Sequence, residues 1–251
     1  MPGTARTRSR VLPPPARIGT LRESGLHAAL KRWYAQPGDE LETALEGYVI
    51  DIRRGALLIE IQTRSFASLR RKLAALAERH PIRIVHPIAA RKWIVRLDED
   101  GREIGRRRSP KAGRIEALFF ELVSIPDFVG HPNLTIDVAL THEDEVWQRT
   151  GRRAWRRGGW CVVERRLVEV MRVVPFADAA DFAALLPPDL AHPFGARDLA
   201  AALGLRLNLA YKMIYCLRRM GAIEVAGKKG RAAAYSLCSP LEGELSARRA
   251  D

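Results

Sequence analysis

The sequence has few cysteines and no long hydrophobic run. Its three cysteines, Cys161, Cys216 and Cys238, lie far apart and outside any metal-ligand spacing. An odd, scattered set argues against a disulfide framework and a zinc site, and it favours a reducing compartment. The sequence also lacks an apolar run of about 18 residues, the length that a membrane-spanning helix needs, and the apolar core of a signal peptide. We therefore expect a cytoplasmic protein with no membrane partner.

Acidic residues are scarce relative to basic ones. The chain contains 42 Lys and Arg but only 29 Asp and Glu, which gives a formal net charge of +13. Such an excess is typical of proteins that bind polyphosphates. Because the basic residues cluster, a nucleic-acid partner explains the positive charge better than an Arg-rich composition that has no functional meaning. DNA is the expected partner, in the nucleoid if the source is prokaryotic, and RNA stays open because backbone charge does not identify the sugar.

Composition divides the chain into four segments. Residues 1–17 are rich in Arg and Pro and residues 239–251 are polar, so both ends are expected to be disordered tails. Residues 18–176 alternate short apolar runs with helical patterns, whereas residues 177–238 are dominated by Ala- and Leu-rich helical segments. We therefore predict two folded domains between two tails.

The first domain begins with a helix and a hairpin. Apolar residues recur at helical spacing over residues 21–34, and two β-branched runs at 47–52 and 56–62 flank the turn Arg53-Arg54-Gly55. Further elements are expected in this order: a helix capped by Ser65, a strand at 82–85, a hairpin of 93–97 and 103–107, a helix at 115–123, and strands at 134–140 and 160–174 with an Arg-rich loop between them. This order predicts an α/β fold, with a mixed sheet flanked by helices.

Two acidic residues interrupt the apolar strands of the first hairpin. Residues two apart on a strand share a face, so Glu60 and Gln62 point to one side, and Asp51 can lie beside them across the turn. Clustered carboxylates repel each other unless a cation offsets their charge. Mg²⁺, or Mn²⁺ in its place, prefers oxygen ligands and usually joins one or two carboxylates to phosphate oxygens. An ordinary hairpin with acids facing solvent is the alternative.

This pattern resembles the PD-(D/E)XK superfamily, the restriction-endonuclease-like fold, in which an acid on one strand and an acid-x-Lys triplet on the next assemble a metal site. The matching residues are Asp51 and Glu60-Ile61-Gln62, preceded by Glu23 on the first helix. The resemblance covers roughly residues 21–97. It implies a restriction-endonuclease-like sheet and metal-dependent hydrolysis of a phosphodiester, with Asp51 and Glu60 as the ligands of Mg²⁺.

One position departs from the superfamily pattern. Gln62 stands where the pattern has Lys, and an amide cannot carry the positive charge of an ammonium group. Arg64 on the same strand face, or Arg71 or Lys72 on the next helix, could stabilise charge on the scissile phosphate instead, and of these two helix residues we choose Lys72. Glu23 and His27 are four residues apart on one helix face and could support the metal and its water. A helix-start acid beside a packing histidine is the alternative.

The second domain has the pattern of a helix-turn-helix. A helix over 195–204 ends at a glycine, and a second helix runs to Gly221. In the second helix, apolar residues at i, i+3, i+4 and i+7 predict the buried stripe Ala210, Met213, Ile214 and Leu217. The expected DNA contacts lie on its opposite face and on a basic turn: Asn208, Tyr211, Lys212, Tyr215, Arg219, Lys228, Lys229 and Arg231.

This second arrangement resembles the winged-helix family over roughly residues 178–238, with the basic turn at 227–231 as the wing. The resemblance implies a DNA-binding module, and protein docking is the alternative.

Two functional hypotheses follow from the sequence. The first is a Mg²⁺-dependent DNA endonuclease to which the winged helix delivers the substrate. The second is a catalytically inactive protein that keeps a nuclease fold for DNA binding or regulation, which Gln62 favours. Cutting both strands with one site per chain would favour a homodimer.

Overall fold

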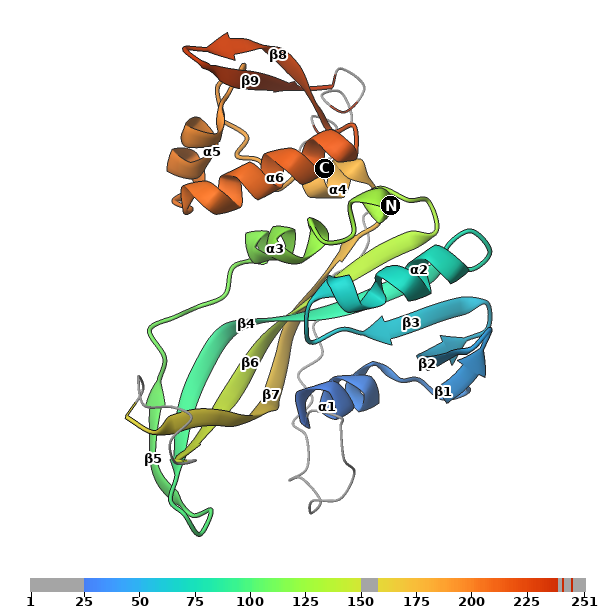
Figure 1. Cartoon of the computed structure of the whole chain (residues 1–251), viewed down its shortest axis with the longest axis vertical. Coiled ribbons are helices and arrows are strands. Elements are labelled where there is room, and N and C mark those ends of the chain that lie inside the picture. Colours follow the sequence, from blue (N-terminus) through green and yellow to red (C-terminus); the bar gives the residue numbers. More distant parts are fainter. Residues whose placement is uncertain (1–24, 150–157, 239–240, 242–244, 246–251) are drawn as a thin grey trace.

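The computed structural model describes residues 25–149, 158–238, 241 and 245 (Figure 1). A seven-stranded mixed sheet forms the N-terminal part, and a two-stranded sheet lies in the C-terminal part. The predicted tail at 1–17, most of the tail at 239–251 and most of the Arg-rich loop fall outside these described residues. None of the described helices is long and apolar enough to span a membrane.

The large sheet has the strand order β1-β2-β3-β4-β6-β7, with β5 paired to β4. Its strands are β1 (Glu40–Leu45), β2 (Tyr48–Arg54), β3 (Leu57–Ile61), β4 (Ile82–Leu97), β5 (Glu103–Arg108), β6 (Leu134–Arg149) and β7 (Trp160–Phe176). The first three strands are antiparallel, β3, β4 and β6 run parallel, and β7 returns antiparallel to β6. The expected mixed sheet is therefore confirmed, and the hairpin of β2 and β3 lies where the sequence predicts it.

Helices cover both faces of the sheet near β2, β3 and the start of β4. On one face lies α1 (Gly25–Tyr34), whose Leu26 and Leu30 pack against Ile52 and Ile59. The other face carries α2 (Arg70–Leu76) and α3 (Phe119–Leu122), with the short 3-10 helices η1 (Phe66–Leu69), η2 (Ile115–Leu118) and η3 (Pro126–Phe128). As predicted, Ser65 caps this segment, because its side chain accepts a hydrogen bond from the Ala67 N–H.

Two features of the sheet differ from the prediction. The edge strand β1 is additional, and its mostly exposed residues show no apolar alternation. The strands expected at 82–85 and 93–97 are one continuous strand, β4, because β6 pairs with it along its whole length. Pro87 does not interrupt this strand, and β6 correspondingly continues well past residue 140 to Arg149.

The outer parts of the long strands extend beyond the helices as an arm (Figure 1), and α1 packs against β7 near the base of this arm, where Gly25 lies close to Glu164. We define the arm as residues 91–108, 142–149 and 160–169, where β4, β5, β6 and β7 pair only with one another. The predicted hairpin around residues 98–101 forms its tip, with β5 antiparallel to β4.

The C-terminal part consists of α4 (Ala179–Ala183), α5 (Ala196–Leu203), α6 (Leu207–Arg219), β8 (Ile223–Lys229) and β9 (Ala232–Leu237). Gly204 ends α5 in the left-handed conformation, and β8 and β9 form an antiparallel hairpin. A bridge between Phe194 and Tyr235 adds a short third pairing. The predicted stripe of α6 is buried, from Ala210 to Leu217.

The two parts share one hydrophobic cluster. Ile136 of the large sheet, Phe119 of α3 and Phe182 of α4 belong to the same cluster as Leu217 of α6. The end of β7 at Phe176 coincides with the predicted boundary. A division into two independently folding domains stays a prediction.

Candidate functional site

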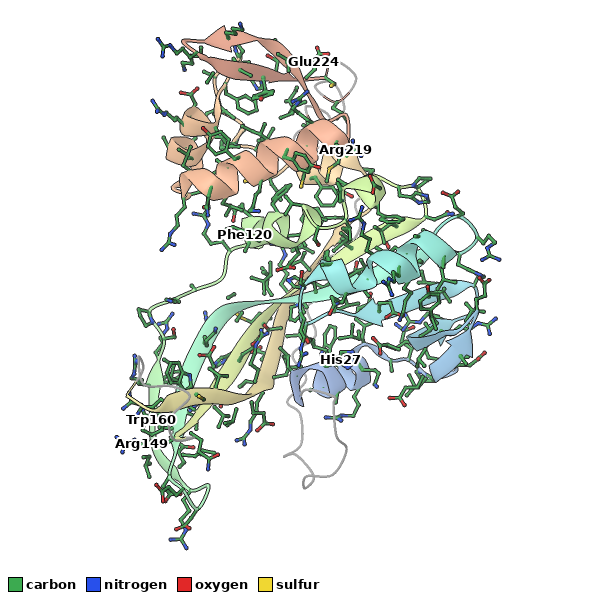
Figure 2. The ribbon with its side chains drawn as sticks, in the orientation of Figure 1. His27, Phe120, Arg149, Trp160, Arg219 and Glu224 are labelled. Carbon is green, nitrogen blue, oxygen red and sulfur yellow. The ribbon has the colours of Figure 1, made fainter. Side chains whose placement is uncertain are left out.

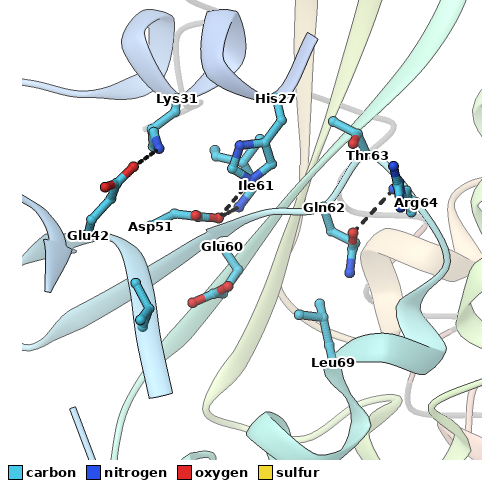
Figure 3. Close-up of a pocket in the computed structure, with 11 residues that line it drawn as sticks. His27, Lys31, Glu42, Asp51, Glu60, Ile61, Gln62, Thr63, Arg64 and Leu69 are labelled. Carbon is cyan, nitrogen blue, oxygen red and sulfur yellow. Dashed lines mark hydrogen bonds and ion pairs between the residues drawn. The ribbon is translucent and has the colours of Figure 1, made fainter. Parts of the chain in front are cut away.

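A pocket of about 460 Å³ opens at the carboxyl end of β3, between α1 and η1 (Figure 3). Its walls come from α1, β1, β2, the end of β3 and the turn into η1. The lining residues are His27, Lys31, Glu42, Val49, Asp51, Glu60, Ile61, Gln62, Thr63, Arg64 and Leu69. Both predicted metal ligands, Asp51 and Glu60, are among them.

Asp51 is held at the point where β2 and β3 separate. Its Oδ2 atom accepts a hydrogen bond of 2.8 Å from the Ile61 N–H and lies 3.2 Å from His27 Nε2. Burial alone would raise the pKa of Asp51, but the hydrogen bonds and the charge of His27 outweigh it, and the pKa lies below its ordinary value. The carboxylate of Asp51 is therefore kept ionised.

Glu60 has the opposite electrostatic setting. It is only 5% exposed, and burial raises its pKa to about 7 although the nearby Lys72 lowers it. The negative charge of Asp51 also raises this pKa. Lys72 Nζ donates to Glu60 Oε2 and to the Val49 carbonyl, each at 2.7 Å.

One oxygen of Glu60 is left without a partner. Glu60 Oε1 is buried and accepts no hydrogen bond from the groups that the structure describes. Buried carboxylate oxygens are normally satisfied by a donor or a cation, so this oxygen is a candidate position for a ligand.

The two acids share one pocket but reach toward different helices. Asp51 lies beside His27 of α1 (Figure 3), whereas Glu60 accepts a hydrogen bond from Lys72 of α2. The strand register explains why the two acids are close. Ile52 pairs with Ile59, and Asp51 and Glu60 are the next residues of the two antiparallel strands on the side of the pocket.

Gln62 and Lys72 make different contacts in the structure. Gln62 Nε2 donates to Ser68 Oγ at 2.7 Å, and its Oε1 accepts from the Arg64 N–H at 3.2 Å. Gln62 thus closes the turn into η1, while Lys72 supplies the ammonium group beside Glu60. Glu23, the fifth predicted catalytic residue, lies outside the described residues.

Distant polar residues that the sequence did not single out support the pocket rim. His86 Nδ1 lies 2.7 Å from the Gln62 carbonyl, and burial lowers the pKa of this imidazole. Arg165 of β7 donates to the Thr63 carbonyl at 3.5 Å and to the fully buried Glu143 at 2.9 Å. No local pattern predicts these contacts, because His86 belongs to β4, the neighbour of β3 in the sheet, and Arg165 belongs to β7, which reaches the segment after β3 only in the folded sheet.

The residues predicted to contact DNA fall into two groups. Asn208, Tyr211 and Tyr215 are exposed on α6, and Lys228 and Arg231 are exposed at the turn between β8 and β9.

The second group has partners within the chain. Lys212 lies over the Phe120 ring of α3, 5.7 Å from its centroid, and Arg219 donates to Asp127 at 3.2 Å (Figure 2). Lys229 donates to Asp198 of α5 at 2.9 Å. The flank of α6 that carries Lys212 and Arg219 therefore faces the N-terminal part of the chain.

The described residues contain no cluster of three or more His, Cys, Asp or Glu side chains that could hold a metal ion. Asp51 and Glu60 make a pair of carboxylates. A pair suits Mg²⁺, which usually keeps several waters and binds one or two carboxylates together with substrate phosphates. The orphaned Glu60 Oε1 fits such an ion.

Comparison with known proteins assigns this chain to a family. A family described as "Domain of unknown function (DUF8091)" matches residues 24–177. The chain belongs to this family. A protein of Treponema pallidum (strain Nichols), described as "Uncharacterized protein", is 31% identical over 221 residues, which is 87% of this chain and 86% of the relative. No solved structure matches the chain.

The DUF8091 region contains all the residues that line the pocket and the whole arm, and it ends one residue beyond β7. The similarity to the Treponema protein covers 87% of the chain, so it must extend past residue 177 into the C-terminal part. Neither description names an activity, so the function has to be inferred from the geometry.

Proposed function

We propose that this DUF8091 protein is a metal-dependent phosphodiesterase that cleaves nucleic acid, with DNA as the expected substrate. The observation that carries the proposal is the pocket in which the ionised Asp51 and the buried Glu60, with its unpartnered Oε1, lie next to Lys72. A helix, three antiparallel strands, a helix and a parallel strand surround these residues, which is the order that the PD-(D/E)XK resemblance implies with the edge strand β1 added.

Asp51 and Glu60 would hold the ion, Mg²⁺ or Mn²⁺. When bound, such an ion lowers the pKa of a coordinated water and polarises a phosphoryl oxygen. The Ile61 N–H and His27 keep Asp51 anionic and fix its direction. Lys72 favours the anionic form of Glu60. It also supplies a positive charge beside Glu60, which the neutral amide of Gln62 cannot do. Arg64, on the pocket lining, is in a position to attract the phosphate.

The C-terminal part would engage the substrate as a winged helix. The order α5, α6, β8 and β9, with the additional bridge between Phe194 and Tyr235, supports this part of the proposal. Lys228 and Arg231 at the tip of the hairpin suit phosphate contacts, and Asn208 on α6 suits a base edge. Lys212 and Arg219 would instead contact the N-terminal part, Lys212 at Phe120 and Arg219 at Asp127.

The proposal is tested by incubating the purified protein with plasmid DNA and Mg²⁺ or Mn²⁺. Cleavage is expected for the wild type, with a loss of at least about 100-fold in Asp51→Asn and Glu60→Gln, because both remove a ligand charge. Lys72→Met should lose about tenfold or more, whereas Gln62→Ala should lose less, because the Gln62 amide closes a turn.

Glu116→Gln is the matched control. Glu116 is also a buried carboxylate with a basic partner, Arg114, but it lies on η2 outside the pocket. Its substitution should leave cleavage unchanged. Absence of metal-dependent cleavage by the wild type on supercoiled, linear and single-stranded DNA and on RNA would overturn the proposal.

A second candidate function is DNA binding without chemistry. Gln62 in place of Lys, and the engagement of both its amide atoms, favour it. Salt-dependent DNA binding that needs no metal and is unchanged in Asp51→Ala, together with absent cleavage, would select this candidate. A homodimer in solution would suit the nuclease, because each chain offers one pocket for two strands.

A further inference from the structure

The arm and the pocket lie at the same end of the sheet. The pairing of β3 with β4 stops at Ile61 and Val85, at the pocket, whereas β4 continues from His86 to Leu97. At roughly 3.3 Å per residue this continuation spans up to about 40 Å. A polymer that leaves the pocket in this direction would therefore pass along the arm.

The outer strand of the arm is basic and exposed. Residues 102–111 contain five basic residues and one acidic residue, and every residue of β5 is exposed. Within the described part of the chain, Arg107 and Arg108 have no carboxylate within the 4.0 Å that defines an ion pair, whereas Arg106 is paired with Asp144 at 2.8 Å. Unpaired guanidinium groups on an exposed strand are suited to bind phosphates.

Other arginines of the arm lie over tryptophan rings, which restrict the positions of their side chains. Arg106 lies over Trp93 at 4.6 Å, and Arg96 and Arg149 lie over Trp160 at 5.0 and 5.4 Å. Figure 2 places Arg149 and Trp160 together toward the outer end of the arm. A cation held against a ring loses less side-chain entropy when it binds a phosphate, and half-buried rings can also stack on unpaired bases.

The arm is tied to the rim of the pocket by a buried ion pair. Arg165 donates to Glu143, whose other oxygen accepts from Thr141 at 2.7 Å, and also to the Thr63 carbonyl on the pocket lining. This contact fixes the base of the arm relative to the pocket.

We infer that the arm binds the sugar-phosphate backbone of a nucleic acid that runs from the pocket along β4 and β5, through Arg107 and Arg108 in particular. The direction of this path rests on the proposed function, because it assumes that the polymer occupies the pocket. Binding through phosphates is independent of base sequence. At roughly 3.4 Å per base pair, the stretch of β4 from His86 to Leu97 would cover about 12 base pairs beyond the pocket.

The test compares Arg107→Ala/Arg108→Ala with Arg53→Ala/Arg79→Ala in the full chain without divalent metal. The control removes the same charge from β2 and from the turn after α2, outside the arm, where both arginines form solvent-exposed ion pairs. Fluorescence anisotropy would be measured with a duplex of about 24 base pairs and a hairpin of about six base pairs, longer and shorter than the arm at roughly 3.4 Å per base pair. DNA and RNA versions of both probes are used.

The arm variant is expected to bind the long duplex about tenfold more weakly than the wild type, and the slope of log affinity against log salt should fall by about 2, one for each lost phosphate contact. The short hairpin and the control variant should change less than about twofold. A loss on DNA alone, RNA alone or both supports the inference and assigns the polymer.

Unchanged affinity and salt slope for the long duplex in the arm variant would overturn the inference, as would wild-type binding to poly-glutamate but to neither nucleic acid. Failure of the proposed function is distinguishable from this. Arm-dependent binding without cleavage rejects the hydrolytic role alone, whereas cleavage that the arm variant retains in full, with unchanged binding, rejects the arm alone.

Discussion

The base and the arm of the large sheet place charged groups in opposite environments. At the base, helices cover both faces, and Glu60 is buried with a pKa raised to about 7. On the arm none of the described helices covers β5, and Arg107 and Arg108 are exposed to solvent. One sheet therefore holds a desolvated acid at its base and, on its arm, solvated basic groups that attract anions over a long range.

The largest expected contrast is in stability. Leu73 of α2 packs against the base of the sheet and is only 1% exposed. Leu73→Ala should therefore lower the free energy of unfolding by about 2–5 kcal/mol. Ile104 of β5 is 59% exposed, and Ile104→Ala should change it by less than about 0.5 kcal/mol. Urea unfolding followed by circular dichroism measures both. Equal losses would show that the arm contributes to the core as much as the base does.

The next contrast concerns pH. Because the pKa of Glu60 is raised to about 7 in the folded chain, the folded state binds this proton more tightly than the unfolded state. The resulting stabilisation is present at low pH and is lost as pH rises from the unfolded value, about 4.3, toward about 7. Urea unfolding of the metal-free protein at a series of pH values should show this loss.

Glu60→Gln serves as the reference for that measurement, because it removes the titrating group and keeps the other titrating residues. Identical pH dependences for the variant and the wild type would contradict the raised pKa. Ionisation of Glu60 should also make metal-dependent cleavage rise with pH up to about 7.

The smallest effect is expected where charged groups pair in solvent. Asp127 accepts from Arg70 at 3.3 Å and from Arg219 at 3.2 Å, and all three side chains are largely exposed. Asp127→Ala should therefore lower the free energy of unfolding by only a few tenths of a kcal/mol. A loss above about 1 kcal/mol in thermal or urea unfolding would mean that this contact holds α6 in place.

Local pattern was sufficient for several elements of the fold. The β2–β3 hairpin, the Ser65 cap and the buried stripe of α6 depend on residues close in sequence, where periodicity and turn chemistry are informative. Strand β1 lacked such a signal, because Glu42 adopts a positive φ and its neighbours are exposed. The continuity of β4 is set by its long pairing with β6, which no local window contains.

The candidate site shows the same limit. Asp51, Glu60 and Lys72 come from one short stretch, so strand alternation and the following helix predict that they lie near one another. That Asp51 turns to His27 of α1 and Glu60 to Lys72 of α2 could not be predicted in this way. His86 and Arg165 could not, because they reach the rim from other strands.

The apolar spacing of α6 was sufficient to predict its buried stripe. It carries no information about which other part of the chain packs against the remaining surface of the helix. Lys212 and Arg219 accordingly contact Phe120 and Asp127, residues that lie far away in the sequence.

The edge position of β5 bears on self-association. Among the described strands it pairs with β4 alone, so one side of its backbone keeps unsatisfied amide and carbonyl groups that a strand of a second molecule could join. Three consecutive arginines, Arg106 to Arg108, would meet their own copies in an antiparallel joining of this kind. Their mutual repulsion makes β5 a poor template for aggregation and directs any homodimer contact to another part of the surface.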